Sequence, residues 1–145
     1  VVQAPRWAGE DSPIVMGDAN DAYSEYRLVS ATSIDILMVV FYQSHWNSAL
    51  NQYQTSQETQ RGYGPINEVA FQSQRAQEWI LRCAEPETPH IWRRCGYTAR
   101  YDEFVIELSA GVGPYGISVP EFEDLLRAVD QRAIELLGPM PTPTP

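Results

Sequence analysis

Two cysteines, Cys83 and Cys95, carry the most specific chemistry in the sequence. Each closes a short strand-like run, and an acidic loop with two prolines connects the two runs. Thiols at the facing ends of paired strands can form a disulfide, which for so short a loop stabilises the fold by about 3 kcal/mol. Metal ligation is the weaker interpretation, because there is no second cysteine pair and the only histidines are His45 and His90. We therefore expect a disulfide, with two buried thiols as the alternative, and no metal site.

Carboxylates offer general acid–base catalysis, and the sequence holds two close pairs, Glu85 with Glu87 and Asp102 with Glu103. Such pairs in loops are ordinarily solvated charge, since a catalytic pair needs a pocket that tunes its pKa values. The sequence has no nucleophile elbow, zinc signature or nucleotide-binding fingerprint. All ten basic residues are arginine, which excludes mechanisms that use a lysine. We assign no catalytic residue, expect no cofactor, and keep a hydrolase as an alternative function.

Three arginines, Arg93, Arg94 and Arg100, are close in sequence and could recognise a carboxylate or phosphate through their guanidinium groups. This pattern gives a second alternative function, a sensor for an anion or another small ligand. Arg93 and Arg94 are neighbours on an expected strand, so their side chains should point to opposite faces. Salt bridges to the many acids are the simpler explanation of the cluster.

Aromatic residues are the other candidates for binding, because aromatic side chains and arginine anchor protein interfaces. The chain has four Trp and eight Tyr. Those expected at the surface, because they fall in or beside loops, are Trp7, Tyr53, Tyr63 and Tyr115. These residues predict a surface for a protein partner.

Charge and hydropathy limit the partners. The formal net charge of -9 disfavours nucleic acid, which requires a concentrated positive surface. No stretch approaches the roughly 20 apolar residues of a membrane span. A hydrophobic content of 43% over 145 residues is enough for one domain with a sizeable core. We therefore expect a single folded domain that is at most peripheral to a membrane.

The best-marked element is a helix over residues 118–137. Ser118 is a capping residue, and Glu121 completes a capping box three residues later. Gly138 gives the left-handed stop at the other end. Apolar residues recur at helical spacing, and Asp124, Arg127, Asp130, Arg132 and Glu135 are expected on the solvent face.

The other elements are expected from their patterns of apolar and polar residues. A second helix is expected over about residues 44–61, with an outer half that is almost wholly polar. A tight turn at residues 100–103 should connect two strands as a hairpin. The expected strands cover residues 23–30, 34–42, 66–71, 77–83, 92–101 and 104–110. A short helix leading into a strand is the alternative for residues 23–30, and residues 72–83 also fit one face of a helix. This order predicts an α+β fold in which two helices, about 44–61 and 118–137, pack on one face of an antiparallel sheet.

The ends of the sequence differ from its middle. Residues 1–138 are expected to form the single domain, with an irregular segment over residues 1–17. Residues 139–145 alternate proline with threonine or methionine and are expected to be extended. Such a tail, together with the expected disulfide, favours an extracytoplasmic location, either periplasmic, cell-surface or secreted.

The run from Cys95 to Val105, followed by the capped amphipathic helix, resembles small surface lipoproteins and sensor-type domains of bacteria. The resemblance covers roughly residues 78–137. It implies an antiparallel sheet with a disulfide and terminal helices, an extracytoplasmic location, and a binding or accessory role. It transfers no catalytic residue. Our leading hypothesis is a non-catalytic extracytoplasmic domain that binds a partner protein. An accessory subunit of an assembly at a membrane surface is one form that this role can take.

Overall fold

The computed structural model describes residues 22–29, 35–43, 46–65, 68–85, 93–114 and 116–140. The elements in chain order are β1 (Ala22–Val29), β2 (Asp35–Tyr42), α1 (Trp46–Gln57), the 3-10 turn η2 (Glu58–Gln60), β3 (Glu78–Cys83), β4 (Arg93–Tyr101), β5 (Phe104–Val112) and α2 (Val119–Leu137). The five strands form one antiparallel sheet in the order β1-β2-β5-β4-β3. The predicted α+β fold, an antiparallel sheet with two helices, is confirmed.

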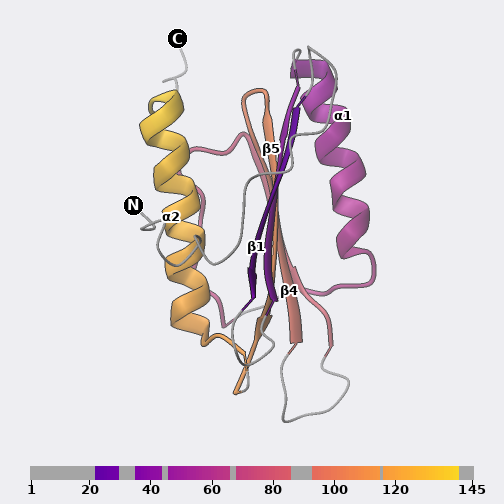
Figure 1. The fold of residues 1–145 in the computed structure, drawn as a ribbon, viewed down its shortest axis with the longest axis vertical. Helices are drawn as coiled ribbons and strands as arrows, with labels where there is room; N and C mark the ends of the chain where they lie inside the picture. The colour runs from indigo at the N-terminus through magenta and orange to yellow at the C-terminus, as the bar shows by residue number, and fades with distance from the viewer. Residues whose placement is uncertain are drawn as a thin grey trace.

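The two helices lie on opposite faces of the sheet, so the prediction that both pack on one face is wrong. Figure 1 shows the sheet edge-on between α1 and α2. Val105 of β5 packs with Tyr53 of α1, whereas Leu108 belongs to the core cluster that contains Leu126 of α2. Alternate positions of a strand point to opposite faces, and residues 105 and 108 are of opposite parity. Both faces of β5 therefore need a covering helix.

The larger core lies between α2 and the sheet. Phe122, Leu126, Val129 and Ala133 of α2 are buried in it against β4 and β5. The capping box is present as predicted: Ser118 Oγ accepts from the Glu121 N–H at 3.2 Å, and the Glu121 carboxylate accepts from the Ser118 N–H at 2.7 Å. This reciprocal pair satisfies two amides that the first turn of a helix leaves unpaired.

The layer between α1 and the sheet is partly polar. Ser56 and Gln60 are only 1% and 2% exposed. The Gln60 Nε2 donates to Thr98 Oγ1 at 2.9 Å. A Cβ on Gly96 would lie 3.0 Å from the Gln60 side chain, so glycine on β4 makes the room for this buried glutamine. Because the buried side of α1 and η2 includes a hydroxyl and an amide, this stretch shows little apolar pattern.

The hairpin between β4 and β5 forms where the sequence predicts it. Its turn residues are Asp102 and Glu103, and Asp102 has a φ of 55°. Asp tolerates this left-handed conformation better than most residues. The strand expected over residues 66–71 is wrong in its described part, since residues 68–71 belong to no strand.

The disulfide joins Cys83 of β3 to Cys95 of β4, as predicted. The two residues are direct partners in the β3–β4 register, with 4.0 Å between their Cα atoms. Both cysteines are buried, with exposures of 4% and 0%. Among the helices described, none is long and apolar enough to cross a membrane.

Candidate functional site

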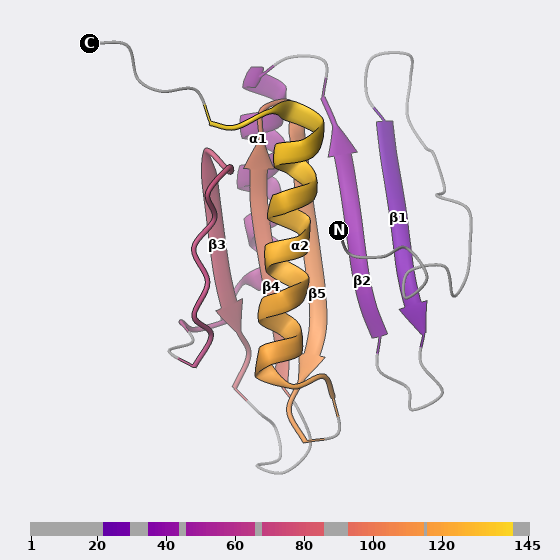
Figure 2. The same cartoon turned by 90° about the vertical axis from the view of Figure 1, so that its left-hand side faces the viewer.

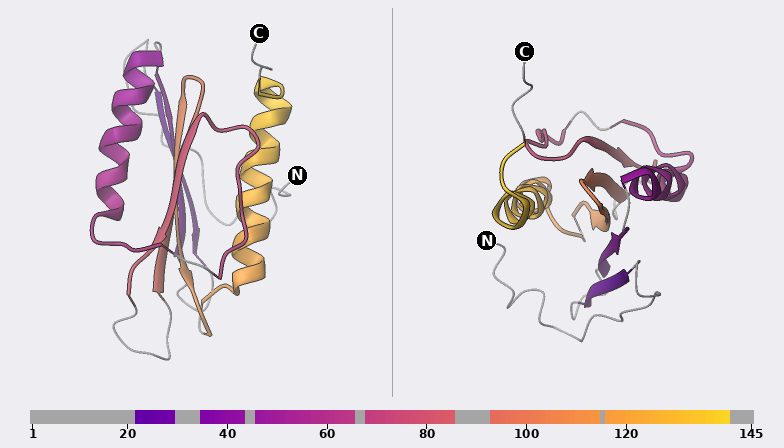
Figure 3. Two further views of the ribbon diagram at one scale, coloured as in Figure 1. Left: turned by 180° about the vertical axis from the view of Figure 1, so that it is seen from behind. Right: turned by 90° about the horizontal axis from the view of Figure 1, so that it is seen from above.

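A segment without helix or strand, residues 68–77, runs beside α2 before the chain enters β3. Figures 2 and 3 show this segment passing over the sheet edge next to the helix. The Ala70 N–H donates to the Glu123 carboxylate at 2.9 Å, and the Gln74 N–H donates to Asp130 at 2.8 Å. The segment therefore follows α2 in the same direction along this part of the helix. We call it the crossing segment.

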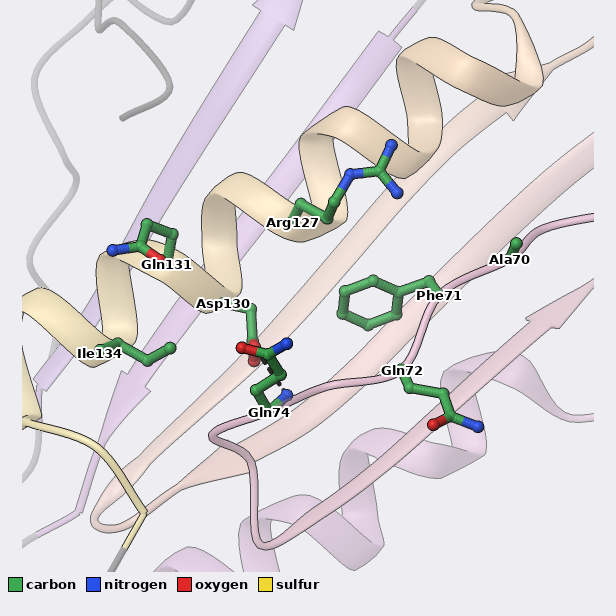
Figure 4. A pocket seen from close by; sticks show the side chains of 8 residues that line it. All are labelled: Ala70, Phe71, Gln72, Gln74, Arg127, Asp130, Gln131 and Ile134. Carbon is green, nitrogen blue, oxygen red and sulfur yellow. Dashed lines mark hydrogen bonds between the residues drawn. The ribbon is translucent and has the colours of Figure 1, made fainter.

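An open groove of about 370 Å³ lies between the crossing segment and α2. Figure 4 shows its lining, with the Phe71 ring lying between the segment and the helix. The lining residues are Ala70, Phe71, Gln72, Gln74, Arg127, Asp130, Gln131 and Ile134. Three of these side chains are uncharged amides, which both donate and accept hydrogen bonds. The groove is therefore amphipathic and rich in neutral polar groups.

Asp130 fixes the crossing segment to the base of the groove. Its carboxylate accepts from the Ser73 hydroxyl, from the Gln74 N–H and from the Tyr101 hydroxyl, the last at 3.0 Å. Asp130 is 5% exposed, although the sequence placed it on the solvent face of the helix. That expectation is wrong, because a carboxylate with three donors can be buried.

Two tyrosines extend this network into the core. The Tyr101 hydroxyl donates to Asp130, so the Tyr97 hydroxyl donates to the Tyr101 oxygen, at 2.8 Å. Burial raises the pKa of both tyrosines well above the usual value for a phenol. Both tyrosine hydroxyls therefore stay protonated and act as hydrogen-bond donors.

Arg75 fixes the other end of the crossing segment. This arginine is 1% exposed, and its guanidinium pairs with Asp102 in the β4–β5 turn. Its Nε donates to the Gly138 carbonyl just beyond α2, at 2.7 Å. Burial of Asp102 opposes its charge, but hydrogen bonds from Arg75 and Gln77 hold its pKa below the ordinary value. Arg75 thus joins the segment, the turn and the end of the helix.

Charged residues lie at one end of the groove. Arg127 pairs with Asp124 at 2.9 Å and with Glu123 at 3.7 Å. The hydrogen bond that Arg127 donates to Asp124, together with the charges of the two neighbouring carboxylates, raises the pKa of Arg127. Two carboxylates around one guanidinium leave this end with an excess of negative charge.

Of the four aromatic residues predicted to form a surface, the two that the structure describes, Tyr53 and Tyr63, do not line this groove. Trp7 and Tyr115 lie outside the described residues. Tyr63 follows η2 and is half-buried. The surface position expected for Tyr53 is wrong, because this residue of α1 is 5% exposed and packs in a core cluster with Val105 of β5. Burial, reinforced by the charge of Glu78, raises the pKa of Tyr53 to about 12.

The three arginines predicted as an anion site are also apart. The Arg93 guanidinium donates to Glu68 at 2.8 Å, and this hydrogen bond lowers the pKa of Glu68. Arg94 donates to Ser109 Oγ at 3.1 Å on the opposite face. Arg100 pairs with Glu78. It lies six residues after Arg94 on β4, which is about 20 Å at the rise of a strand. Individual polar partners, two of them acidic, therefore account for these arginines.

The groove residues were missed at the level of sequence. Asp130 lies four positions after the buried Leu126, but a single Asp next to an apolar stripe ordinarily faces solvent. Phe71 falls in the strand expected over residues 66–71, and Gln74 falls in the stretch over residues 72–83 that fits either a helix or a strand. Their role depends on contacts with α2 that are more than fifty residues distant in sequence.

Comparisons with protein-family models, with curated proteins and with solved structures find no match to this chain. In the described part of the chain, no group of three or more His, Cys, Asp and Glu residues is arranged to hold a metal ion. The functional assignment therefore depends on the geometry of the groove.

Proposed function

We propose that this chain is a non-catalytic extracytoplasmic domain that binds a partner protein, and that the groove between the crossing segment and α2 receives an extended segment of that partner. The observation that carries the proposal is the lining: neutral amides and apolar groups along an open channel with charge at one end.

The length and chemistry of the groove suit an extended peptide. On α2 it reaches from Arg127 to Ile134, which is about 10 Å at the rise of an α-helix. That length matches roughly three residues of an extended chain. Gln72, Gln74 and Gln131 can each pair with the main-chain amides of a peptide of any sequence. Phe71 and Ile134 offer apolar contact to its side chains.

The groove is organised before any partner arrives. Asp130 and Arg75 hold the crossing segment at two points, through donors and acceptors that are largely buried. A site whose backbone is already ordered loses less conformational entropy on binding. This rigidity supports a recognition role for a segment that has no regular secondary structure of its own.

Charge favours a basic partner. The chain has a net charge of -9, and the carboxylates of Glu123 and Asp124 outnumber Arg127 at one end of the groove. Complementary charge raises the rate of encounter and fixes the direction of binding. We therefore expect a partner segment with a positive side chain at the Glu123 end.

Location is inferred from the cysteines. A buried disulfide between β3 and β4 is typical of proteins that mature in an oxidising compartment. This supports an extracytoplasmic site of action. An accessory subunit of an assembly at a membrane surface is the role that the resemblance to bacterial surface lipoproteins and sensor-type domains suggests.

A small ligand is the second candidate, because the groove volume falls within the range of small-molecule sites, roughly 300–1,000 Å³. The openness of the groove favours the peptide. A sensor domain would bind free metabolites in the same place, and the experiment below separates the two.

Selection from a displayed library of random unstructured peptides tests the proposal. We expect the selected peptides to carry basic residues, with binding weakened about tenfold or more by Ile134→Asp in the groove. Leu136→Asp is the matched control, because Leu136 is on the same helix, is 66% exposed and does not line the groove. Failure to enrich peptides, or equal losses in the two variants, would overturn the assignment. Enrichment failure with specific binding of a small molecule would favour the sensor.

A further inference from the structure

The two edges of the sheet differ in how they end. On the β3 edge, Gly64 pairs with Cys83 through two main-chain hydrogen bonds, both 2.9 Å long. On the β1 edge, all eight residues pair with β2 on the inner side, and no other described strand pairs on the outer side. Figures 2 and 3 show β1 at the margin of the sheet, away from both helices. The β1 edge is therefore the place where another strand could add.

Apart from two charged residues, the β1 sequence has none of the features that ordinarily prevent strand addition. Proteins protect their edges with proline, lysine, bulges or short strands. β1 has eight residues, which is longer than the average strand of about five to six, and contains neither proline nor lysine nor glycine. Its two charged residues, Glu25 and Arg27, are of opposite sign and two positions apart.

These two charges make β1 complementary to itself. In an antiparallel pair of β1 strands related by a two-fold axis at Tyr26, Glu25 of each copy is opposite Arg27 of the other. Centring the pair on residue 25 or 27 instead would place two glutamates or two arginines opposite each other. Opposite charges stabilise a cross-strand pair and like charges destabilise it, so one symmetric register is favoured.

We propose that β1 is a homodimer interface, at which two copies of this chain join through antiparallel β1 strands centred on Tyr26 into one continuous ten-stranded sheet. Every second residue of an edge strand directs its main-chain N–H and C=O groups outward. When the pair is centred on a residue, these outward groups of the two copies face each other and can form an antiparallel ladder. The interface is isologous, so it closes at two copies and does not propagate. At physiological ionic strength, screening over about 8 Å limits the repulsion between two chains of net charge -9.

Sedimentation velocity on the disulfide-bonded chain across a range of concentrations tests this interface. We expect a reversible dimer of the unmodified chain. Arg27→Glu and Glu25→Arg should each weaken dimerisation about tenfold or more, because each places like charges opposite. Circular dichroism verifies that each variant is folded. Arg61→Glu is the matched control, since Arg61 is exposed beyond η2 and carries the same charge change; it should dimerise like the unmodified chain.

Two rescue experiments make the result specific to the register. The double variant Glu25→Arg with Arg27→Glu should dimerise like the unmodified chain. An equimolar mixture of the two single variants should form a mixed dimer, because each supplies the charges that the other lacks. A chain that stays monomeric at every concentration would overturn the proposal, as would equal losses in Arg27→Glu and Arg61→Glu or a mixture that does not associate. A monomer that instead captures a strand of another protein would overturn it as well.

Discussion

Buried polar residues, more than apolar ones, distinguish this domain. Asp130, Arg75 and Gln60 are each at least nine-tenths buried, and each joins elements that are distant in sequence. Leaving such a group without partners costs about 1–3 kcal/mol. The described structure therefore depends on a few side chains that composition alone would place on the surface.

Glu107 leads to a prediction about pH. Its carboxyl lies on the α1 side of β5, where burial raises its pKa and a hydrogen bond with Ser56 opposes the rise only in part. The folded state thus holds this proton more tightly than the unfolded state. The stabilising contribution is present below the unfolded value of about 4.5 and is lost as pH rises through the folded pKa.

We expect Glu107→Gln to remove this dependence. The variant should gain stability relative to the unmodified chain as pH rises from acidic to neutral, measured as the difference in urea midpoints. Glu58→Gln, on an exposed side chain of η2, is the control and should show no such trend. Asp102 acts in the opposite direction, since its stabilising contribution is lost as pH falls through its lowered pKa. Because the variant and the unmodified chain both contain Asp102, its contribution cancels in the difference between their urea midpoints. A difference that does not change with pH would contradict the account of Glu107.

At the scale of elements, the contact between the crossing segment and α2 is the feature that makes a groove. It contains no regular ladder, and hydrogen bonds to the two helical side chains Glu123 and Asp130 hold the segment in place. Phe71, which lines the groove, also meets Trp79 and Tyr97 edge-on. The crossing segment and α2 should therefore lose their order together if the Asp130 carboxylate is removed.

Asp130→Ala tests this coupling. The change leaves the Tyr101 hydroxyl and the Gln74 N–H without their acceptor, and we expect the free energy of unfolding to fall by about 3 kcal/mol. Asp124→Asn, on an exposed side chain of the same helix, should change it by less than about 0.5 kcal/mol. Urea unfolding measures both values, and hydrogen exchange should show faster exchange along the crossing segment. Equal stability of the two variants would contradict the anchoring role.

Local patterns predicted the elements better than their arrangement. The capping box at Ser118, the turn at Asp102 and the Cys83–Cys95 pair are short-range features, and all three form. The side of the sheet that α1 covers was not predictable, because the buried face of this helix includes Ser56 and η2 adds the buried Gln60. The groove was not predictable either, since it depends on Asp130 meeting a segment that has no periodic pattern.

At the scale of the whole molecule, the two proposed surfaces are separate. The groove lies on the α2 face, next to the β3 edge, whereas β1 forms the opposite edge of the sheet (Figure 2). A dimer through β1 would leave both grooves open and would present two of them to one assembly. Two linked sites bind a partner with repeated segments far more tightly than one site does.

The most direct test of the proposed function is site-specific photo-cross-linking of the folded chain in an extract of its native source. A photoreactive residue replaces Gln74, which lines the groove and is exposed. A second preparation carries it in place of Arg132, an exposed residue of α2 that does not line the groove. We predict one adduct of defined mass from position 74, lost when excess unmodified chain competes, and none from position 132. Equal adducts from both positions, or none from position 74, would contradict a partner protein in the groove.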